Sequence, residues 1–432
     1  MRTQAACVSV AAFPDEPPPP YSVVLAGSPP HAWGCGLSLH ACNPKATLRV
    51  TNFREARFAS AANCEVWYGP PFDLFERFCR EFFGSGDVSG ERHVVVAIAY
   101  DAGLPLHGIE PRRLQRGPLL WAAGYEAPCV AVSNAPIVVD QPKPLPEECA
   151  AATAAKAAKL AAWDASQHEL AVRRALDYIA AGDIYQVNLA YPLCATRPGA
   201  AWTLFRLMQQ LQPVPFGAYV HGGDFELVCN SPENFLSRRG AWLVTRPIKG
   251  TRRRGASAKE DLEAMNALRS DPKERAELTM IVDLERNDLG RICEYGSVEV
   301  TSHAEVETFA SLHHLVSTVR GRLQRGVGWS EILHSMFPGG SVTGAPKRRA
   351  MQIINELEVG ARGFYTGALG WLRSPEEADF ALLIRTAVVD AVGVEYWTGG
   401  GIVADSSPAR EYQETLLKAR VFLAGWEEAQ RR

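Results

Sequence analysis

The clearest hydrophobic periodicity in the chain lies just beyond residue 165. Apolar residues between Val172 and Ile179 recur at i, i+3, i+4 and i+7, the spacing of a helix with one buried face. Ser166 and Glu169 form a capping-box pattern before this run, and Gly182 provides a C-terminal stop after it. We therefore predict a helix that begins near Ser166 and ends before Gly182.

Similar patterns predict the other main elements. Short apolar runs bounded by Gly, Pro and Asn predict strands at residues 21–26, 93–99, 184–191, 225–229, 242–245, 364–371, 380–390 and 394–397. Helix signals occur at residues 71–83, 271–288, 329–336, 346–357 and 407–426. The elements are interleaved irregularly, without the strict alternation of a parallel sheet or a fixed repeat, and this order favours an α+β fold.

The composition is that of an ordinary globular protein. The chain has 432 residues, of which 22% are charged and 47% hydrophobic, and its formal net charge is −3. At about 150 residues per domain, this length suggests two or three folding units that can bury a core without disulfides or structural metals. A disulfide scaffold, a coiled coil and a disordered regulator are excluded. A Pro-rich piece at residues 142–146, followed by an Ala- and Lys-rich helix or connector, suggests a boundary near residue 160.

Charge and apolar runs bear on partners and location. The near-neutral net charge provides no global field for DNA or an anionic membrane, so no nucleic-acid partner is expected. No apolar run approaches the roughly 20 residues that span a bilayer. Residues 5–13 are interpreted as a first strand rather than a signal peptide, because acidic, Pro-rich sequence follows them. Ten Cys without a CxxC motif or zinc-ligand spacing indicate reduced thiols, so we expect a cytoplasmic protein with no membrane partner.

Two glycine-rich loops are candidate ligand sites. In the first, residues 338–347, backbone N–H groups before the predicted helix would point at an anion. Gly339 and Gly344 have Walker A spacing, but Ala345-Pro346 replaces the Lys-Ser/Thr of that motif, so a carboxylate is a better candidate ligand than a triphosphate. The second loop, residues 398–401, follows a strand and permits close backbone approach. Either loop could equally be a tight turn.

Carboxylates in two predicted helices are candidate metal ligands. Glu411, Glu414 and Lys418 fall on one stripe of the C-terminal helix, which is either a solvated face with a Glu414–Lys418 pair or part of a divalent cation site. Glu277 lies in register with the apolar residues of the helix at 271–288. Because a buried carboxylate is costly unless it is paired or bound to metal, Glu277 is a second candidate for magnesium ligation.

A basic segment at residues 245–254 contains one lysine, Lys249, among four arginines. Such a run is typical of a solvated or phosphate-binding loop. Clustered cations would also favour the neutral amine of Lys249, which is the form that nucleophilic catalysis needs.

Taken together, these motifs resemble the chorismate-utilising enzymes. The resemblance covers about residues 166–423 and rests on the order of many segments, no one of which would suffice. They are residues 182–189 (GDIYQVNL), 231–233 (SPE), 247–251 (PIKGT), 275–290, 314–317 (HLVS), 338–347, 365–367 (YTG), 384–386 (IRT) and 399–418.

The resemblance implies a fold like that of anthranilate synthase component I. This is a two-layered α+β body of packed, largely antiparallel sheets, with helices outside and a central active-site cleft. Residues 161–432 would form the chorismate-binding catalytic region. Residues 1–160, which match the family weakly, would form an N-terminal region, and the two would make one integrated body.

The resemblance also assigns site residues. It implies that Glu277 and Glu414 bind Mg²⁺, with Glu411 close by, and that the metal clamps the chorismate ring carboxylate. The residues that would contact the substrate are Thr251, His314, Thr343, Gly344, Tyr365, Arg385, Gly400, Gly401 and Lys418.

Two positions distinguish branches of the family. Anthranilate synthases usually have Ala where this chain has Lys249, and isochorismate and salicylate synthases have a water-activating Lys where it has Gln186. Both positions point to amination at C4 of the ring, as in aminodeoxychorismate synthases, which supply p-aminobenzoate for folate. Lys249 would attack C2 while Glu233 protonates the departing C4 hydroxyl. The alternatives are an anthranilate synthase component I and a non-catalytic chorismate-binding regulator.

The source of ammonia is expected to be another protein. The chain contains no convincing glutaminase nucleophile motif and has no room for such a domain after Trp426. We therefore expect a separate glutamine amidotransferase subunit as partner.

Overall fold

The computed structural model describes residues 16–27, 33, 37–84, 91–127, 129–133, 149–309 and 312–431. The strand expected at residues 5–13 and the Pro-rich piece at 142–146 lie outside these residues. In the described chain no helix is both long enough and apolar enough to cross a membrane. The seven cysteines whose side chains are described are all free thiols, as the sequence predicted.

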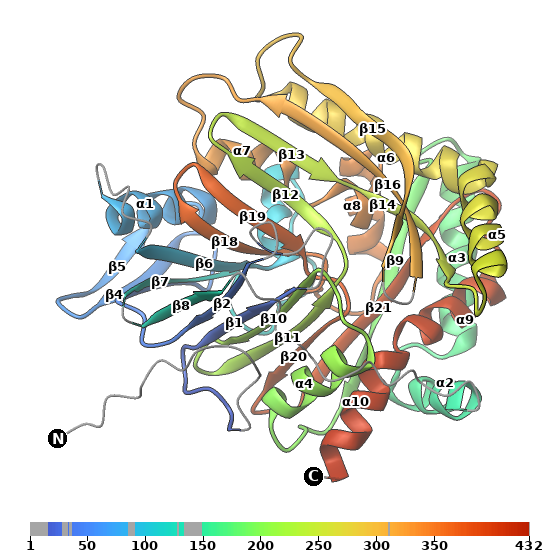
Figure 1. The fold of residues 1–432 in the computed structure, drawn as a ribbon, viewed down its shortest axis with the longest axis horizontal. Coiled ribbons are helices and arrows are strands. Elements are labelled where there is room, and N and C mark those ends of the chain that lie inside the picture. The colour runs from blue at the N-terminus through green and yellow to red at the C-terminus, as the bar shows by residue number, and fades with distance from the viewer. Residues whose placement is uncertain are drawn as a thin grey trace.

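Two antiparallel sheets form the body (Figure 1). The nine-stranded sheet runs in the order β17 (Gly344–Ala345), β9 (Gln186–Ala195), β21 (Val394–Ile402), β20 (Thr386–Asp390), β11 (Phe225–Ser231), β10 (Phe216–His221), β1 (Val23–Ala26), β2 (Ser38–Ala41) and β8 (Val130–Ser133). The twelve-stranded sheet runs in the order β14 (Ile248–Arg253), β16 (Leu312–Arg322), β13 (Trp242–Arg246), β12 (Asn234–Arg239), β19 (Glu377–Leu382), β18 (Ala368–Ser374), β6 (Arg92–Ile98), β7 (Leu120–Glu126), β3 (Ala46–Val50), β4 (Glu55–Ser60) and β5 (Cys64–Tyr68). Its remaining strand, β15 (Glu299–Thr308), pairs with β16.

The alternation of side chains along β6 shows how the layers are held together. Val95 and Ala97 enter a core that both sheets line, whereas Val94, Val96 and Ile98 enter a second core beneath helices. A strand buried on both faces reads as a continuous apolar run, which is why residues 93–99 were recognisable in the sequence. The body is therefore two packed sheets with helices outside, as predicted.

Helices cover the outer face of each sheet (Figure 1). Against the twelve-stranded sheet lie α1 (Pro71–Phe83), α5 (Ala258–Ser270), α6 (Pro272–Gly290) and α7 (Trp329–Met336). Against the nine-stranded sheet lie α2 (Cys149–Leu160), α3 (Ala165–Ala180), α4 (Ala201–Leu211), α8 (Lys347–Leu357), α9 (Pro408–Lys418) and α10 (Arg420–Arg431). Strands from both sides of residue 160 occur in each sheet.

Several element boundaries differ from those the sequence suggested. The helix predicted to begin near Ser166 has its N-cap two residues earlier, at Asp164, which forms the capping box with Gln167. The helix predicted at residues 407–426 is two helices that meet at Ala419, and the strand predicted at 380–390 is two strands in different sheets. A continuous apolar run does not reveal where the chain leaves one sheet for the other.

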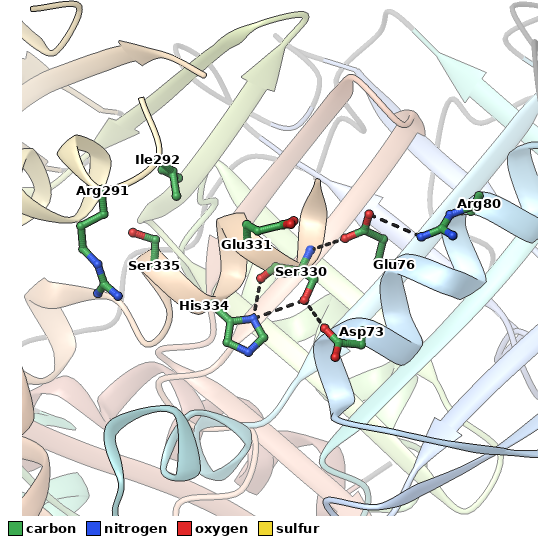
Figure 2. A pocket seen from close by; sticks show the side chains of 9 residues that line it. All are labelled: Asp73, Glu76, Arg80, Arg291, Ile292, Ser330, Glu331, His334 and Ser335. Atoms are coloured by element: carbon green, nitrogen blue, oxygen red, sulfur yellow. Dashed lines mark hydrogen bonds and ion pairs between the residues drawn. The ribbon is translucent and has the colours of Figure 1, made fainter. Parts of the chain in front are cut away.

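Side-chain contacts join α7 to α1. The backbone N–H of Ser330 donates a 2.8 Å hydrogen bond to Glu76, and the Ser330 hydroxyl donates one to Asp73 (Figure 2). Carboxylates at a helix N-terminus compensate the exposed N–H groups there. A groove of about 560 Å³ lies at this joint, and none of the predicted site residues lines it.

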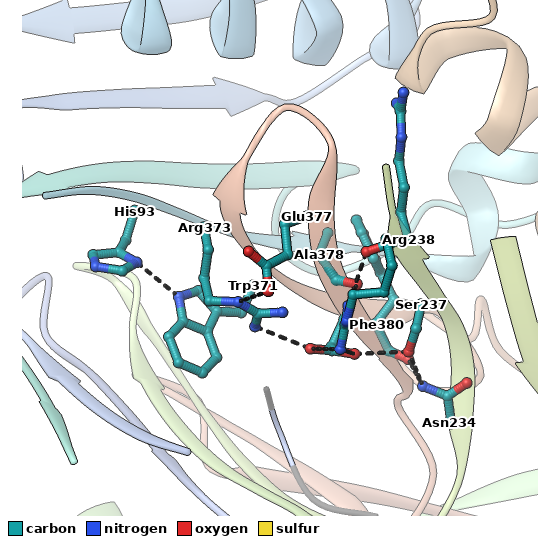
Figure 3. Close-up of polar contacts among 11 residues, drawn as sticks. His93, Asn234, Ser237, Arg238, Trp371, Arg373, Glu377, Ala378 and Phe380 are labelled. Atoms are coloured by element: carbon teal, nitrogen blue, oxygen red, sulfur yellow. Dashed lines mark hydrogen bonds and ion pairs between the residues drawn. The ribbon is translucent and has the colours of Figure 1, made fainter. Parts of the chain in front are cut away.

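A network of hydrogen bonds and ion pairs connects the hairpin of β18 and β19 to β12. Ser237 donates a 2.7 Å hydrogen bond to Asp379, which also pairs with Arg239 and Arg373 (Figure 3). Asp379 is 3% exposed, so its charge is neutralised within the sheet. This network fixes the strands that lead into the site described next.

Candidate active site

The candidate site begins where two neighbouring segments cross from one sheet to the other. The chain leaves β11 and enters β12 through Glu233, and it leaves β19 and enters β20 through Arg385. The crossings are held side by side, because the N–H of Leu382 donates to the Glu233 carbonyl and the N–H of Asn230 donates to the Arg385 carbonyl, each at 3.1 Å. The topology therefore brings an acid and a cation together.

Glu233 is a buried carboxyl with few partners. Its side chain is 7% exposed, and Ser341 donates a 2.7 Å hydrogen bond to Oε1. Burial raises the pKa of Glu233 above its ordinary value, while the Ser341 hydrogen bond and the Lys249 charge offset part of the rise. A carboxyl in this setting suits a general acid.

Arg385 presents an unpaired guanidinium group. Its backbone has φ +50°, and in the described part of the chain no hydrogen bond or ion pair to its side chain is found. The side chain is partly exposed. Loss of hydration lowers the pKa of Arg385, while nearby Tyr396 and Glu233 favour its charged form. A free guanidinium beside a site is suited to a carboxylate ligand.

Lys249 and Gln186 face the same glycine. A Cβ atom at Gly401 would stand 3.6 Å from Lys249 Nζ and 3.1 Å from Gln186 Nε2. Gln186 is fully buried, and neither polar atom of its amide has a hydrogen-bond partner. Unsatisfied buried amides are rare in native proteins, so this pair of atoms points to a ligand.

His314 and Thr251 contact each other near Arg385. His314 is 3% exposed, and its Nδ1 lies 3.0 Å from Thr251 Oγ1 and 3.3 Å from the Gly250 carbonyl. Burial, reinforced by the Arg385 charge, lowers the pKa of His314 to about 4. The ring is therefore neutral at pH 7 and can accept or donate a hydrogen bond without adding charge.

The glycine strand of β21 also meets α9. The ammonium group of Lys418 donates a 3.0 Å hydrogen bond to the Gly399 carbonyl and pairs with Glu414 at 2.8 Å. A Cβ atom at Gly400 would stand 3.4 Å from Glu411 Oε2. Burial raises the pKa of Glu411, whereas Lys418 lowers the pKa of Glu414. Gly400, Glu411 and Lys418 are thus neighbours.

The N-terminal turns of α6 lie near the same acids. Lys273 is close enough to lower the pKa of both Glu411 and Glu414, and Lys249 is close enough to lower that of Glu414 and Glu274. Burial and the neighbouring Glu277 raise the pKa of Glu274. Sequence reasoning missed Glu274, although its i, i+3 spacing from Glu277 repeats that of Glu411 and Glu414.

These four glutamates have the donor chemistry of a magnesium site. Mg²⁺ prefers carboxylate oxygens, and the like charges of each i, i+3 pair repel one another until a cation lies between them. Among the described residues, no three His, Cys, Asp or Glu side chains are gathered closely enough to hold a metal ion. The magnesium ligands Glu277, Glu411 and Glu414 therefore stay a prediction.

The first glycine-rich loop packs tightly against β9. Thr343 is fully buried, its hydroxyl donates to the Gly339 carbonyl at 2.9 Å, and its carbonyl accepts from the Asn188 N–H. Gly344 has φ +139°, and a Cβ atom there would stand 2.2 Å from the Gln186 carbonyl oxygen. In this structure Thr343 and Gly344 hold the loop against β9. That they also contact the substrate stays a prediction.

Tyr365 lies next to a buried ion pair that was not predicted from the sequence. Burial raises the pKa of Tyr365 to about 12, so it remains a hydrogen-bond donor. Arg362, 2% exposed, pairs with Glu358 at 2.6 Å and donates to the carbonyls of Asn188 and Val342. This guanidinium ties β9, the glycine-rich loop and the Tyr365 turn together.

Two more buried acids lie further along α6. Glu285 and Asp288 are each 3% exposed, whereas Glu277 is only partly buried. Apolar periodicity singled out Glu277 because it cannot tell how deeply each turn of a helix enters the core.

Comparison with known proteins identifies the family. The sequence model of the chorismate binding enzyme family matches residues 88–424, more than half of the chain. An aminodeoxychorismate synthase component 1 from Bacillus subtilis is 43% identical over 249 residues, which is 58% of this chain and 53% of that protein. An anthranilate synthase component 1 from Thermus thermophilus is 45% identical over 260 residues, 60% of this chain and 56% of that protein. The matched segment thus spans about half the length of these curated relatives.

A solved structure supports the same relationship over nearly the whole fold. The anthranilate synthase component I from Streptococcus pneumoniae superposes with a TM-score of 0.74 at 28% identity, covering 92% of this chain and 94% of that one. The family model covers more than half of the chain and this solved structure has the same fold, so the chain belongs to the chorismate binding enzyme family.

Proposed function

We propose that the protein transfers ammonia to C4 of chorismate and forms 4-amino-4-deoxychorismate. The observation that carries the proposal is the placement of Lys249 beside Gln186 and near Glu233. It supplies an amine and a buried acid at one place. Relatives named both aminodeoxychorismate synthase and anthranilate synthase are similar to the chain, so the choice between C4 and C2 amination rests on these residues.

The substrate would be held by charge and by hydrogen bonds. Chorismate carries two carboxylates, and the unpaired guanidinium of Arg385 suits one of them. Lys418 and the phenol of Tyr365 are further donors, and neutral His314 would contact the ring side without repelling Arg385. Gly400 and Gly401 allow the ligand to approach the backbone of β21.

Two displacements with allylic shift would follow. The neutral amine of Lys249 attacks C2, the ring double bond moves, and the C4 hydroxyl leaves as water after it takes the proton of Glu233. Ammonia then attacks C4, the double bond moves back, and the bond from C2 to Lys249 breaks. Lys249 leaves as the free amine, and the nitrogen added at C4 gives one proton back to Glu233, so that the sum is chorismate plus ammonia giving aminodeoxychorismate plus water.

Magnesium is part of the proposal. Glu277, Glu411 and Glu414, with Glu274, would hold it, and the bound ion would offset the charge of the ring carboxylate and fix the orientation of the ring. Lys273 and Lys418 lie by these acids and offset part of their charge. The proposal also includes a separate glutamine amidotransferase subunit as the source of ammonia.

The reaction can be tested on the purified chain. It is incubated with chorismate, Mg²⁺ and an ammonium salt at alkaline pH, and aminodeoxychorismate lyase is added afterwards. We expect p-aminobenzoate only after the lyase, and no product when glutamine replaces ammonium. The Lys249→Ala variant should form none, whereas Lys259→Ala, at an exposed lysine on α5, should match the unaltered chain. Fluorescent anthranilate before the lyase, or no p-aminobenzoate after it, would reject the proposal.

A further inference from the structure

Glu285 is the buried acid of α6 that the proposed function leaves without a role. Its neighbour Asp288 is neutralised, because the Lys347 ammonium group lies 2.5 Å from Oδ2 and also donates to the Met336 carbonyl at 3.0 Å. Glu285 is 3% exposed, and within the described chain no Lys or Arg forms an ion pair with it. Burying such a group costs free energy unless its oxygens accept hydrogen bonds or pair with a cation.

The carboxylate of Glu285 contacts two separate segments. The Thr245 hydroxyl at the end of β13 donates to Oε2 at 3.3 Å, and the backbone N–H of Gly340 also donates to the carboxylate. A Cβ atom at Gly340 would stand 3.2 Å from Glu285 Oε1 and 2.6 Å from a Leu284 methyl carbon. The absence of a side chain at Gly340 thus lets the loop approach α6.

These two segments are the ones that hold the Glu233 carboxyl. Ser341, next to Gly340, donates its hydroxyl to Glu233, and the backbone N–H of Ile248, three residues beyond Thr245, donates to the same group. Glu285 therefore contacts the two segments that also hold the Glu233 carboxyl.

We propose that Glu285 is a positioning residue that fixes the general acid Glu233 through the Gly340–Ser341 turn and the β13–β14 connection. The inference rests on the proposed role of Glu233 and adds the element that holds it. When an amide NH2 group replaces one carboxylate oxygen of Glu285, Thr245 and Gly340 no longer both donate to this side chain, and the hydroxyl of Ser341 no longer has a fixed direction. The carboxyl of Glu233 would then lose the hydrogen bonds that stabilise its charged form.

The charges and hydrogen bonds that act on these acids define the direction in which we expect the pKa of Glu233 to move. Lys249 from β14 and Arg385 from the β19–β20 crossing face Glu233, and Asp288 and Lys347 face Glu285. Because hydrogen bonds from Ser341 and Ile248 lower the pKa of Glu233, their weakening moves that pKa upward. The alkaline limb of the pH profile of kcat should move to higher pH.

The test compares Glu285→Gln, Ser341→Ala and the double variant. We expect each single variant to lower kcat about tenfold with little change in KM, because a displaced acid affects the chemical step. The double variant should lose no more than either single one, since both act through one contact. Independent, additive losses, or a changed KM with an unchanged pH profile, would overturn the inference. Glu263→Gln, at an exposed acid on α5, is the control.

A second readout does not depend on turnover. The infrared carboxyl band that disappears in Glu233→Gln is titrated in the unaltered chain and in Glu285→Gln, and the midpoint should move to higher pH in the variant. An unmoved midpoint would overturn the inference whatever product the enzyme makes. Failure of C4 amination with a moved midpoint would reject the proposed function alone. If Glu285→Gln does not fold, Thr245→Val, which removes one of the two donors, should show the same direction of change.

Discussion

Loss of the Glu358 charge should destabilise the protein strongly. Arg362 and Glu358 are 2% and 1% exposed, and they share hydrogen bonds of 2.9 and 2.6 Å. Glu358 also accepts from the Ala190 N–H of β9 at 2.9 Å. The substitution Glu358→Gln leaves the shape of the side chain nearly unchanged, but it leaves the Arg362 guanidinium in the core without a counter-charge.

The magnitude follows from the burial. Breaking a fully buried ion pair costs about 3–5 kcal/mol, because the remaining charge is uncompensated. The glutamine retains one acceptor oxygen, and Arg362 keeps its contacts to the carbonyls of Asn188 and Val342 and to Thr366. We therefore expect Glu358→Gln to lower the free energy of unfolding by about 3 kcal/mol, the lower end of this range.

The assay is urea unfolding followed by fluorescence and by circular dichroism. Glu81→Gln is the matched control, because the Arg77–Glu81 pair has the same i, i+4 spacing but side chains 47% and 45% exposed. It should cost less than about 0.5 kcal/mol. Replacing both partners, Glu358→Gln with Arg362→Met, should recover part of the loss. A cost below about 1 kcal/mol for Glu358→Gln would refute the reasoning that Arg362 is charged and desolvated.

Three further outcomes are expected. Burial raises the pKa of Asp101 from 3.8 to about 7; the folded chain binds this proton more tightly, so Asp101 lowers stability by roughly 4 kcal/mol as pH rises from about 4 to 7. Urea unfolding of Asp101→Asn should lack that loss, and equal pH slopes would contradict it. Lys249→Ala should abolish C4 amination yet still bind chorismate with Mg²⁺ by calorimetry; full activity would reject covalent catalysis. Glu414→Gln should weaken binding of Mg²⁺ and chorismate together, whereas an unchanged magnesium titration would favour a solvated helix face.

Local signals predicted some elements well. The helix at residues 71–83 and the helix at 329–336 have the bounds that the sequence indicated, because Pro or Gly precedes each one and an amphipathic run follows. The crossing at Leu383–Arg385 was not visible, since apolar residues continue through it while the chain changes sheets. Asp164 and Ser166 are both good caps; in the structure Asp164 is the N-cap, and the Ser166 hydroxyl donates a hydrogen bond to it.

The candidate site was found from the order of motifs rather than from local chemistry. Lys249 lies on β14, whereas Glu233 and Arg385 lie in the two crossings between the sheets, and only the topology of the fold brings the three together. Glu274 could have been found from its spacing to Glu277. The Glu358–Arg362 pair has the spacing of an exposed helix pair, so its burial could not be read from the sequence.

The position of the transferred nitrogen tests the central claim most directly. The chain is supplied with chorismate, Mg²⁺ and isotopically labelled ammonium, and the labelled ring carbon is identified by nuclear magnetic resonance. Our account predicts nitrogen at C4 with the enolpyruvyl group retained. Nitrogen at C2 with release of pyruvate would contradict it.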